Sequence, residues 1–209
     1  MKVVIFDMDG TLIDSKKDIT ISINYVREKN YALPPLSEDF IVEAINMEVR
    51  NLPKLFYETD VYEDADRELF ETHYEKQCTQ NLYLYDGVVT LLKSLKNEDI
   101  KLSVATNAPT KFAKEMLSSL EVAELFDVII GADKVAVSKP DPSMLNAILN
   151  YYDFDRKQDK AWMVGDNSKD IKSAENAGIE AIFATWGFSP SSDFEVVVKE
   201  PKEVLNIVL

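Results

Sequence analysis

The sequence predicts a doubly wound α/β protein, in which a parallel sheet carries helices on both faces and an all-helical insertion interrupts the chain near its start. Two observations lead to this fold class. Short, continuously apolar runs rich in β-branched residues alternate with helical segments over most of the chain, as in buried parallel strands. Between Ser15 and Thr79 there is no glycine, and apolar residues recur at helical spacing.

The expected strands and helices alternate along the core. Apolar runs predict strands over residues 3–6, 102–105, 128–130, 162–164 and 181–184. Amphipathic patterns predict helices between them, over residues 88–96, 110–120, 142–151 and 168–177. In the insertion, helices are expected over residues 16–29, 39–46, 49–57 and 65–77, with prolines at the breaks. The predicted domains are therefore a core of residues 1–14 plus 81–209 and a helical domain of residues 15–80.

Composition and charge narrow the class of protein. The 209-residue chain has 46% hydrophobic residues, enough for a core, and its single cysteine, Cys78, has no partner for an internal disulfide. A formal net charge of −14 disfavours nucleic acid as a partner. The sequence shows no signal-like N-terminus and no apolar stretch of membrane-spanning length, so we expect a cytoplasmic protein without a membrane partner. We expect it to be a monomer or a homodimer.

Polar residues follow four of the expected strands, near the point where each strand ends. They are Asp7 and Asp9, Thr106 and Asn107, Lys139, and Asp166 with Asp170. In a parallel sheet these strand ends share one edge, which is where such folds bind ligands. Clustered carboxylates repel one another, so they indicate a hard divalent cation such as Mg²⁺, typically shared with a substrate phosphate. The pattern indicates phosphoryl chemistry at this edge.

Four short motifs, in this order, resemble those of the haloacid dehalogenase superfamily. They are Asp7-Met8-Asp9-Gly10-Thr11, Thr106-Asn107, Ser138-Lys139-Pro140 and Gly165-Asp166-Asn167-Ser168-Lys169-Asp170. Further segments resemble the phosphoglycolate phosphatase branch: Tyr85-Asp86-Gly87-Val88, Asp141-Pro142, Asn176-Ala177-Gly178 and Trp186-Gly187-Phe188. The resemblance covers essentially the whole chain. It implies a Rossmann-like core, and it makes the helical insertion similar to a class-one cap domain.

The resemblance implies a role for each acid of the first and last motifs. Asp7 would be the nucleophile that forms an aspartyl-phosphate, and it would also bind Mg²⁺. Asp9 would act as general acid and then as general base, with its backbone carbonyl on the metal. Asp166 would be a direct metal ligand. Asp170 would lie one layer further out, supporting the metal through water or orienting Lys139.

The two middle motifs would hold the transferred phosphoryl group. Thr106 and Asn107 would bind its oxygens through hydroxyl, amide and backbone N–H groups, helped by the positive end of the helix that opens near Pro109. Lys139 would bind the phosphoryl group and offset negative charge on it and on Asp7. Taken singly, these residues have plain structural interpretations: a turn, a strand end, a solvated lysine and a helix N-cap. The four motifs together favour the functional interpretation.

The helical insertion offers a candidate for substrate recognition. In related phosphatases a loop between the second and third cap segments selects the substrate. The matching stretch here reads Ile45-Asn46-Met47-Glu48-Val49-Arg50, without the glycine that is common there. Arg50 would bind a substrate carboxylate bidentately, with Asn46 and Glu48 beside it. The alternative is that Arg50 is one exposed charge on a helix.

The predicted function is that of a Mg²⁺-dependent phosphatase of a small phosphorylated metabolite, phosphoglycolate-like or a sugar phosphate. A phosphosugar mutase on the same fold is an alternative, disfavoured because no His-Leu-Lys-Gly-like segment occurs in the insertion. A dehalogenase is disfavoured by Asp9, an acid–base group that those relatives lack. The third alternative is a non-catalytic binding protein. The presence of Asp7, Asp9, Lys139 and Asp166 together argues against it.

Overall fold

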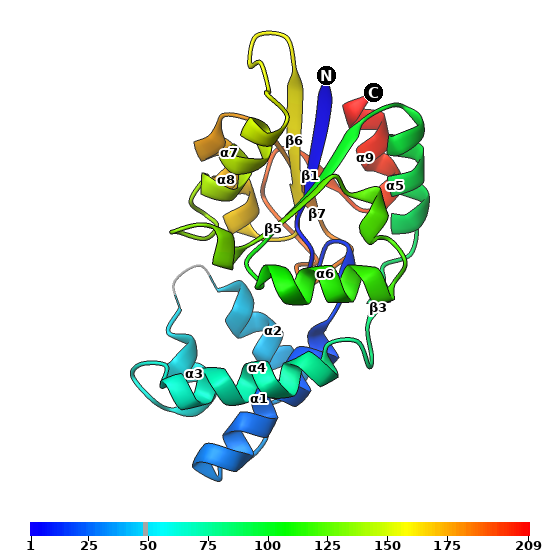
Figure 1. The fold of residues 1–209 in the computed structure, drawn as a ribbon. Helices are drawn as coiled ribbons and strands as arrows, with labels where there is room; N and C mark the ends of the chain where they lie inside the picture. Colours follow the sequence, from blue (N-terminus) through cyan, green and yellow to red (C-terminus); the bar gives the residue numbers. More distant parts are fainter. Residues whose placement is uncertain (48–49) are drawn as a thin grey trace. The chain divides into compact units, whose positions relative to one another are not determined.

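The computed structural model describes residues 1–47 and 50–209. Glu48, predicted to lie beside the substrate, and Val49, the first residue of an expected helix, fall outside the described residues. The described chain separates into two compact units, shown in Figure 1. One comprises Met1–Asp14 with Leu84–Leu209, and the other comprises Ser15–Tyr83, which ends three residues beyond the predicted limit of 80.

The first unit is built on a parallel sheet. Its strands are β1 (Lys2–Phe6), β4 (Lys101–Thr106), β5 (Val128–Gly131), β6 (Lys160–Gly165), β7 (Glu180–Ala184) and β8 (Val197–Val198). They lie in the order β5-β4-β1-β6-β7-β8, and neighbouring strands run parallel. A separate two-stranded sheet pairs β2 (Ile13–Asp14) with β3 (Tyr83–Leu84). The predicted fold class, a doubly wound parallel sheet with a helical insertion, is confirmed.

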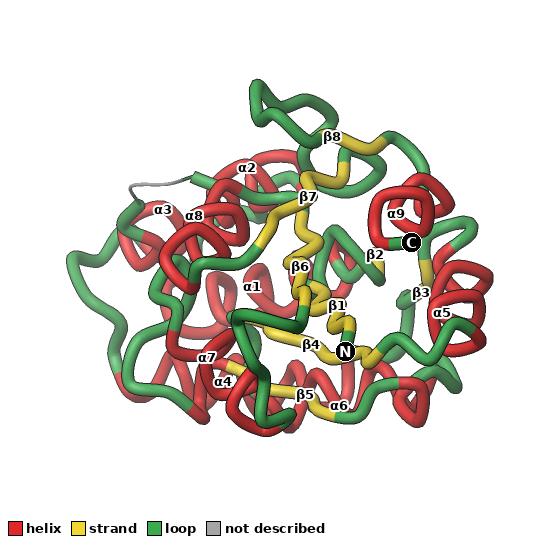
Figure 2. The backbone as a smooth tube through the Cα atoms, turned by 90° about the horizontal axis from the view of Figure 1, so that it is seen from above, coloured by secondary structure: helices red, strands yellow, loops and turns green. Residues whose placement is uncertain are grey.

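Helices cover both faces of this sheet. The helices of the unit are α5 (Val88–Asn97), α6 (Thr110–Ser119), α7 (Ser143–Tyr151), α8 (Ser168–Ala177) and α9 (Pro201–Val208), with 3-10 turns η1 (Ala123–Leu125) and η2 (Ala132–Lys134). Viewed from above, α7 and α8 lie on one side of the strands and α5 and α9 on the other (Figure 2). Alternate residues of β1 face opposite covered sides, which is why residues 3–6 are all apolar. Val3 and Ile5 join the core cluster that includes residues of α7 and α8.

The structure adds two elements at the C-terminus that the sequence patterns did not predict. One is β8, a two-residue edge strand that pairs with β7. The other is α9, which starts with Pro201, whose missing N–H is harmless in a first turn. The side chains of Glu200 and Glu203 form a capping box at the same end of α9.

The second unit is entirely helical apart from its connections. It contains α1 (Lys16–Tyr31), α2 (Glu38–Asn46), α3 (Leu52–Tyr57) and α4 (Asp64–Gln77). Its own apolar core gathers side chains from α1, α2 and α3, including Val26, Ile41 and Phe56. This separate core is what allows the insertion to form a unit of its own. Within the described ranges, we find no helix with the length and hydropathy needed to cross a membrane.

Candidate active site

The strand order of the sheet brings the predicted site residues to one edge. β1 lies between β4 and β6, so the carboxyl ends of these three strands are adjacent. Asp7 follows β1 directly, and its N–H donates to the Val164 carbonyl at 2.8 Å, which continues the pairing with β6. Thr106 is the last residue of β4, and Asp166 follows the end of β6. Residues about 160 positions apart in the chain therefore meet because of sheet topology.

Lys139 is held at the centre of this edge by three acceptors. Its Nζ lies 2.7 Å from Asp7 Oδ1, 2.6 Å from Asp170 Oδ1 and 2.6 Å from the Ala105 carbonyl oxygen. The ammonium is buried, and each of its three hydrogens has a partner. Burial alone would lower the pKa of Lys139, but the carboxylates of Asp170 and Asp7 outweigh it and raise the pKa. Lys139 is therefore a fixed positive charge beside Asp7.

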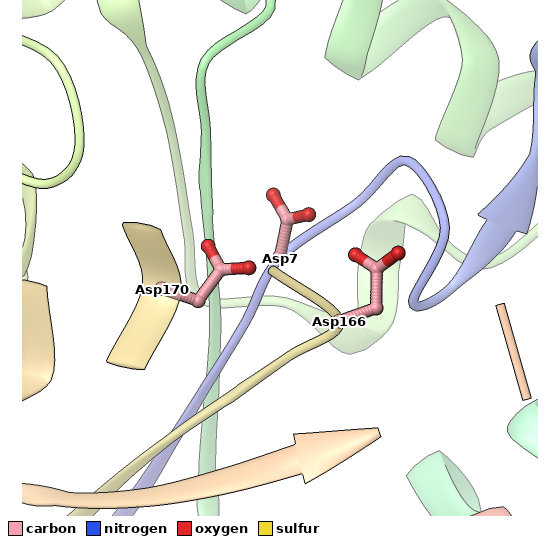
Figure 3. Close-up of side chains that lie close together, drawn as sticks. All are labelled: Asp7, Asp166 and Asp170. Atoms are coloured by element: carbon pink, nitrogen blue, oxygen red, sulfur yellow. The ribbon is translucent and has the colours of Figure 1, made fainter. Parts of the chain in front are cut away.

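Three buried carboxylates surround this position. Oxygens of Asp7, Asp166 and Asp170 all lie within 4.8 Å of one another, and Figure 3 shows the three side chains projecting to the same side. Burial, together with the nearby charges of Asp7 and Asp170, raises the pKa of Asp166 well above its ordinary value of 3.8. The site therefore concentrates negative charge away from water, in excess of what Lys139 compensates.

Asp170 supports the site from the first turn of α8. Asn167 is the N-cap of this helix, and its N–H donates to Asp170 Oδ2 at 3.0 Å, while Lys139 donates to Oδ1. Both oxygens of Asp170 are thus engaged by protein donors. Burial and the charge of Asp7, partly offset by Lys139, raise the pKa of Asp170 to about 6. The ion pair with Lys139 is compatible with the predicted orienting role, and the role of Asp170 stays a prediction.

The donor set fits a hard divalent cation. Lys139 donates to Oδ1 of Asp7. Each oxygen of Asp166 accepts a hydrogen bond, Oδ2 from the Phe188 N–H and Oδ1 from the Thr11 hydroxyl, and a carboxylate oxygen has a second lone pair for a metal ion. All candidate ligands are oxygens, of carboxylates and of the Asp9 carbonyl, which is the donor type that Mg²⁺ prefers. A cation there would balance the excess of buried charge and favour the ionised form of Asp166. The carboxylate of Asp9 is not part of this group among the described residues, which is compatible with its predicted contact through the backbone carbonyl.

The side chain of Asn107 is hydrogen-bonded to the backbone of Lys139. Its Nδ2 donates to the Lys139 carbonyl at 3.1 Å, and its Oδ1 accepts from the Lys139 N–H at 3.0 Å. Thr106 is buried, and its Oγ1 accepts from the Ala108 N–H at 3.1 Å. These contacts give Asn107 a role in positioning Lys139. Phosphoryl binding by Thr106 and Asn107 stays a prediction.

The N-terminus of α6, whose positive end was predicted to help hold the phosphoryl group, has a protein carboxylate at its first residue. The N–H and Oγ1 of Thr110 donate to Asp133 Oδ1 at 2.6 and 2.7 Å. Burial alone would raise the pKa of Asp133, but hydrogen bonds from Thr110, and smaller ones from Lys134 and the Asp133 backbone, together lower the pKa. A carboxylate of the protein therefore already occupies the first turn of α6. The spacing of Asp133 and Thr110 in the sequence gave no sign of this contact.

Arg50 belongs to the helical unit and follows α2 in the chain. The guanidinium is half-buried, and its Nη1 has no hydrogen-bond partner within residues 1–47 and 50–209. Burial lowers the pKa of Arg50, with the charge of Tyr62 as a smaller opposing influence. A buried donor without a protein acceptor is available to an added one. Substrate recognition by Arg50 stays a prediction.

Comparisons with known proteins identify the class of this fold and site. The family described as haloacid dehalogenase-like hydrolase matches residues 4–184. A phosphoglycolate phosphatase of Aquifex aeolicus is 31% identical over 188 residues, covering 90% of this chain and 86% of that protein. An N-acetylmuramic acid 6-phosphate phosphatase of Pseudomonas aeruginosa is 27% identical over 217 residues, covering 100% of this chain and 95% of that protein.

Solved structures agree with the sequence relatives. The crystal structure of a predicted phosphoglycolate phosphatase from Haemophilus somnus has a TM-score of 0.86 and 26% identity, covering 100% of this chain and 98% of that one. The chain belongs to the haloacid dehalogenase-like hydrolase family. Family and phosphatase relatives together confirm the predicted enzyme class, a phosphoric monoester hydrolase of this superfamily.

Proposed function

We propose that this protein hydrolyses a small phosphorylated metabolite with Mg²⁺, through an aspartyl-phosphate on Asp7. The observation that carries the proposal is the position of the Asp7 carboxylate. It lies 2.7 Å from the buried ammonium of Lys139 and within one cluster with Asp166 and Asp170, at the carboxyl edge of the sheet. A carboxylate needs such a setting to approach an anionic phosphoryl group, because the two would otherwise repel each other.

The first chemical step would transfer the phosphoryl group to Asp7. A carboxylate oxygen of Asp7 attacks phosphorus as the bond to the ester oxygen breaks, and Asp9 donates its proton to that leaving oxygen. Lys139 holds the Asp7 carboxylate in one orientation and offsets the charge on the phosphoryl group. Asp170 and the amide of Asn107 fix Lys139 in turn, so the positive charge needs no reorganisation during transfer.

The second step would return Asp7 to its starting state. Water attacks the phosphorus of the aspartyl-phosphate, and Asp9, now a carboxylate, takes the proton of the water. The bond between phosphorus and the Asp7 oxygen breaks, which releases inorganic phosphate. The use of Asp9 in both directions balances protons over the cycle.

Asp7, Asp166 and the carbonyl of Asp9 would hold the Mg²⁺ ion. When bound, the ion supplies positive charge to the phosphoryl oxygens and neutralises charge that develops in the transition state. The fit rests on the excess of buried carboxylates over the single ammonium, and on the all-oxygen donor set.

The helical unit is proposed as the cap that contacts the leaving group. The named relatives act on phosphoglycolate and on N-acetylmuramic acid 6-phosphate, so a small carboxylate-bearing ester and a sugar phosphate are both reasonable substrates here. We expect Asn46 and Arg50, with Glu48 between them, to distinguish these esters. Chemistry on the phosphoryl end would remain with the core residues.

A panel of phosphate esters tests the proposal. Phosphate release would be measured with phosphoglycolate, N-acetylmuramic acid 6-phosphate, hexose phosphates, nucleotides and pyrophosphate, each with Mg²⁺ and with EDTA. We expect Mg²⁺-dependent release from at least one small ester. Conversion of a sugar phosphate into its isomer without phosphate release would instead identify a mutase.

The leaving group tests Asp9. The variant Asp9→Asn should slow turnover of an alkyl phosphate by roughly 10²- to 10⁴-fold, the usual contribution of a positioned proton donor. A nitrophenyl phosphate, whose leaving group needs no proton, should show a smaller defect in the first step. An equally large defect with both substrates would remove Asp9 from the role of general acid.

A further inference from the structure

Segment 186–188, which follows β7, lies against the loop that carries Asp7 and Asp9. The indole Nε1 of Trp186 donates to the Thr11 carbonyl at 2.8 Å. The N–H of Phe188 donates to Asp166 Oδ2 at 3.1 Å. Segment 186–188 thus donates one hydrogen bond to the loop that carries Asp7 and Asp9 and another to Asp166. No role for this segment followed from its resemblance to related phosphatases.

Glycine at position 187 makes this approach possible. A Cβ atom on Gly187 would lie 1.5 Å from the carbonyl oxygen of Gly10, so any side chain would force the two loops apart. Gly10 is under the same constraint from the other side. It has a φ of +84°, and a Cβ atom there would lie 2.4 Å from Asp166 Oδ2 and 2.9 Å from Phe188 Cγ. The backbones of Gly187 and Gly10 are therefore in direct contact, with no side chain between them.

Asp166 is consequently held from two sides. Its Oδ2 accepts from Phe188, and its Oδ1 accepts from the hydroxyl of Thr11 at 3.4 Å. Thr11 is in turn tied through its carbonyl to Trp186. The three contacts form a closed loop from segment 186–188 to the nucleophile loop, to Asp166 and back. Motion of either loop would therefore turn the Asp166 carboxylate.

We propose that segment 186–188 is a positioning strap that sets the affinity of the site for Mg²⁺, by fixing Asp166 and the loop of Asp7 and Asp9 relative to each other. The inference rests on the proposed function, since it presumes that these acids bind the ion. Trp186 is the positioning residue of the strap. Its indole contacts neither the ion nor the substrate in this scheme, and it acts through the Thr11 carbonyl.

The physical reason is preorganisation. Carboxylates around a small octahedral ion must keep their distances and angles, and Mg²⁺ tolerates little departure from this geometry. Partners one layer outside the ligands supply that constraint, and their loss typically weakens metal binding by about 10- to 100-fold. A strap that merely stabilised the fold would lower the melting temperature without changing metal affinity.

The two tryptophans of the chain provide a matched test. Trp162 is also in the core and donates its Nε1 to Glu180 at 2.9 Å, from the strand β6. Mg²⁺ affinity of the full-length protein would be measured by calorimetry for the wild type, Trp186→Phe and Trp162→Phe, with melting temperatures alongside. We expect Trp186→Phe to weaken Mg²⁺ binding by about tenfold or more. We expect Trp162→Phe to bind as the wild type does.

The Mg²⁺ dependence of turnover should change in Trp186→Phe in the same way as the Mg²⁺ affinity. Trp186→Phe should raise the Mg²⁺ concentration needed for half-maximal turnover and recover most of its kcat when Mg²⁺ is saturating. KM for the ester should change little, because the strap is not proposed to touch the substrate. A loss of kcat that saturating Mg²⁺ does not restore would overturn the proposal.

Fluorescence gives a readout that does not depend on how well Trp186→Phe folds. In Trp162→Phe, Trp186 is the single tryptophan, and Mg²⁺ should change its emission because a divalent charge then binds at the loop to which the indole is hydrogen-bonded. If the emission of Trp186 stayed constant while calorimetry showed Mg²⁺ binding to saturation, the strap would be overturned. Equal Mg²⁺ affinities of the wild type and both variants would also overturn it. Absence of Mg²⁺ binding in the wild type would instead refute the proposed function, and the strap with it.

Discussion

The two units of this protein bury aspartates in opposite ways. In the core, oxygens of Asp7, Asp166 and Asp170 lie within 4.8 Å of one another, and the ammonium of Lys139 pairs with Asp7 and Asp170. In the helical unit each buried aspartate stands apart and is surrounded by neutral donors. Asp18 accepts from Gln77 Nε2 at 2.8 Å and from the N–H and Nδ2 of Asn81 at 2.9 and 2.7 Å.

Asp66 follows the pattern of Asp18. It accepts from Asn30 Nδ2 at 2.7 Å and from the hydroxyl of Tyr31, which ties α4 to α1. Such an acid is satisfied by its neighbours and holds helices together. Acids that crowd one another repel, and a proton or a bound cation relieves that repulsion. The comparison indicates that burial of an acid says little about function, whereas its crowding with other buried acids says much.

The largest effect that would test this contrast is loss of the nucleophile. We expect Asp7→Asn to reduce turnover to less than about one-thousandth of the wild-type rate, as loss of a catalytic nucleophile commonly does. The fold should persist, because removing one charge from a crowded acidic site relieves repulsion. Phosphate-release assays and thermal melting would measure the two effects. Residual activity within tenfold of the wild type would exclude Asp7 as nucleophile.

In the helical unit, loss of a buried aspartate should reduce stability and leave Mg²⁺ binding unchanged. Asp18→Ala leaves the donors of Gln77 and Asn81 without their acceptor, which should lower the free energy of unfolding by about 2–4 kcal/mol. Denaturant titration would measure this loss. Calorimetry should show Mg²⁺ affinity unchanged, since Asp18 belongs to the unit that contributes no proposed metal ligand. A change in Mg²⁺ affinity without a change in stability would break the proposed contrast.

Metal binding should stabilise the core, and more so at higher pH. At 100 times its dissociation constant, Mg²⁺ would add about 2.7 kcal/mol, which raises the melting temperature of a chain this size by about 5–10 °C. The pKa values of Asp170, raised to about 6, and of Asp166, also raised, mean that the metal-free fold is favoured by protonation. That contribution is present at low pH and is lost as the pH rises through about 6.

The Mg²⁺ shift in melting temperature should accordingly be larger at pH 7.5 than at pH 5, because protons compete with the ion for these carboxylates. Asp166→Asn serves as the control. It removes a buried charge, so it should melt no lower than the wild type without metal, and it should lose most of the response to Mg²⁺. An equal response at both pH values would argue against a carboxylate site.

The smallest expected effect concerns Arg50. Arg50→Ala should weaken turnover of carboxylate-bearing esters by roughly 1.5–3 kcal/mol in kcat/KM, if the guanidinium meets the carboxylate in a sheltered, charge-assisted pair. Esters without a carboxylate and a small aryl phosphate should be nearly unaffected. A panel lowered uniformly, or not at all, would show that the buried Nη1 of Arg50 serves another purpose.

Part of the core site could be predicted because several of its residues follow strands directly. Asp7, Thr106 and Asp166 stand directly at strand ends, and apolar runs reveal strands well. Asp133 and Phe188 gave no comparable signal. Asp133 acts on the first turn of another helix, and Phe188 acts through its backbone N–H, which no side-chain type encodes. Contacts of these two kinds depend on how loops fold back, not on local pattern.

By itself the sequence determined the alternation of strands and helices, the helical insertion and the ordered motifs, since hydrophobic periodicity and strand-end chemistry are local properties. Only the tertiary structure decided which donors each acid receives. It placed Lys139 between Asp7 and Asp170, surrounded Asp18 with amides, and laid segment 186–188 against Gly10. The charge balance of a buried site depends on all the charges and donors that the fold brings around it. It can therefore be determined only when the order of the strands in the sheet is known.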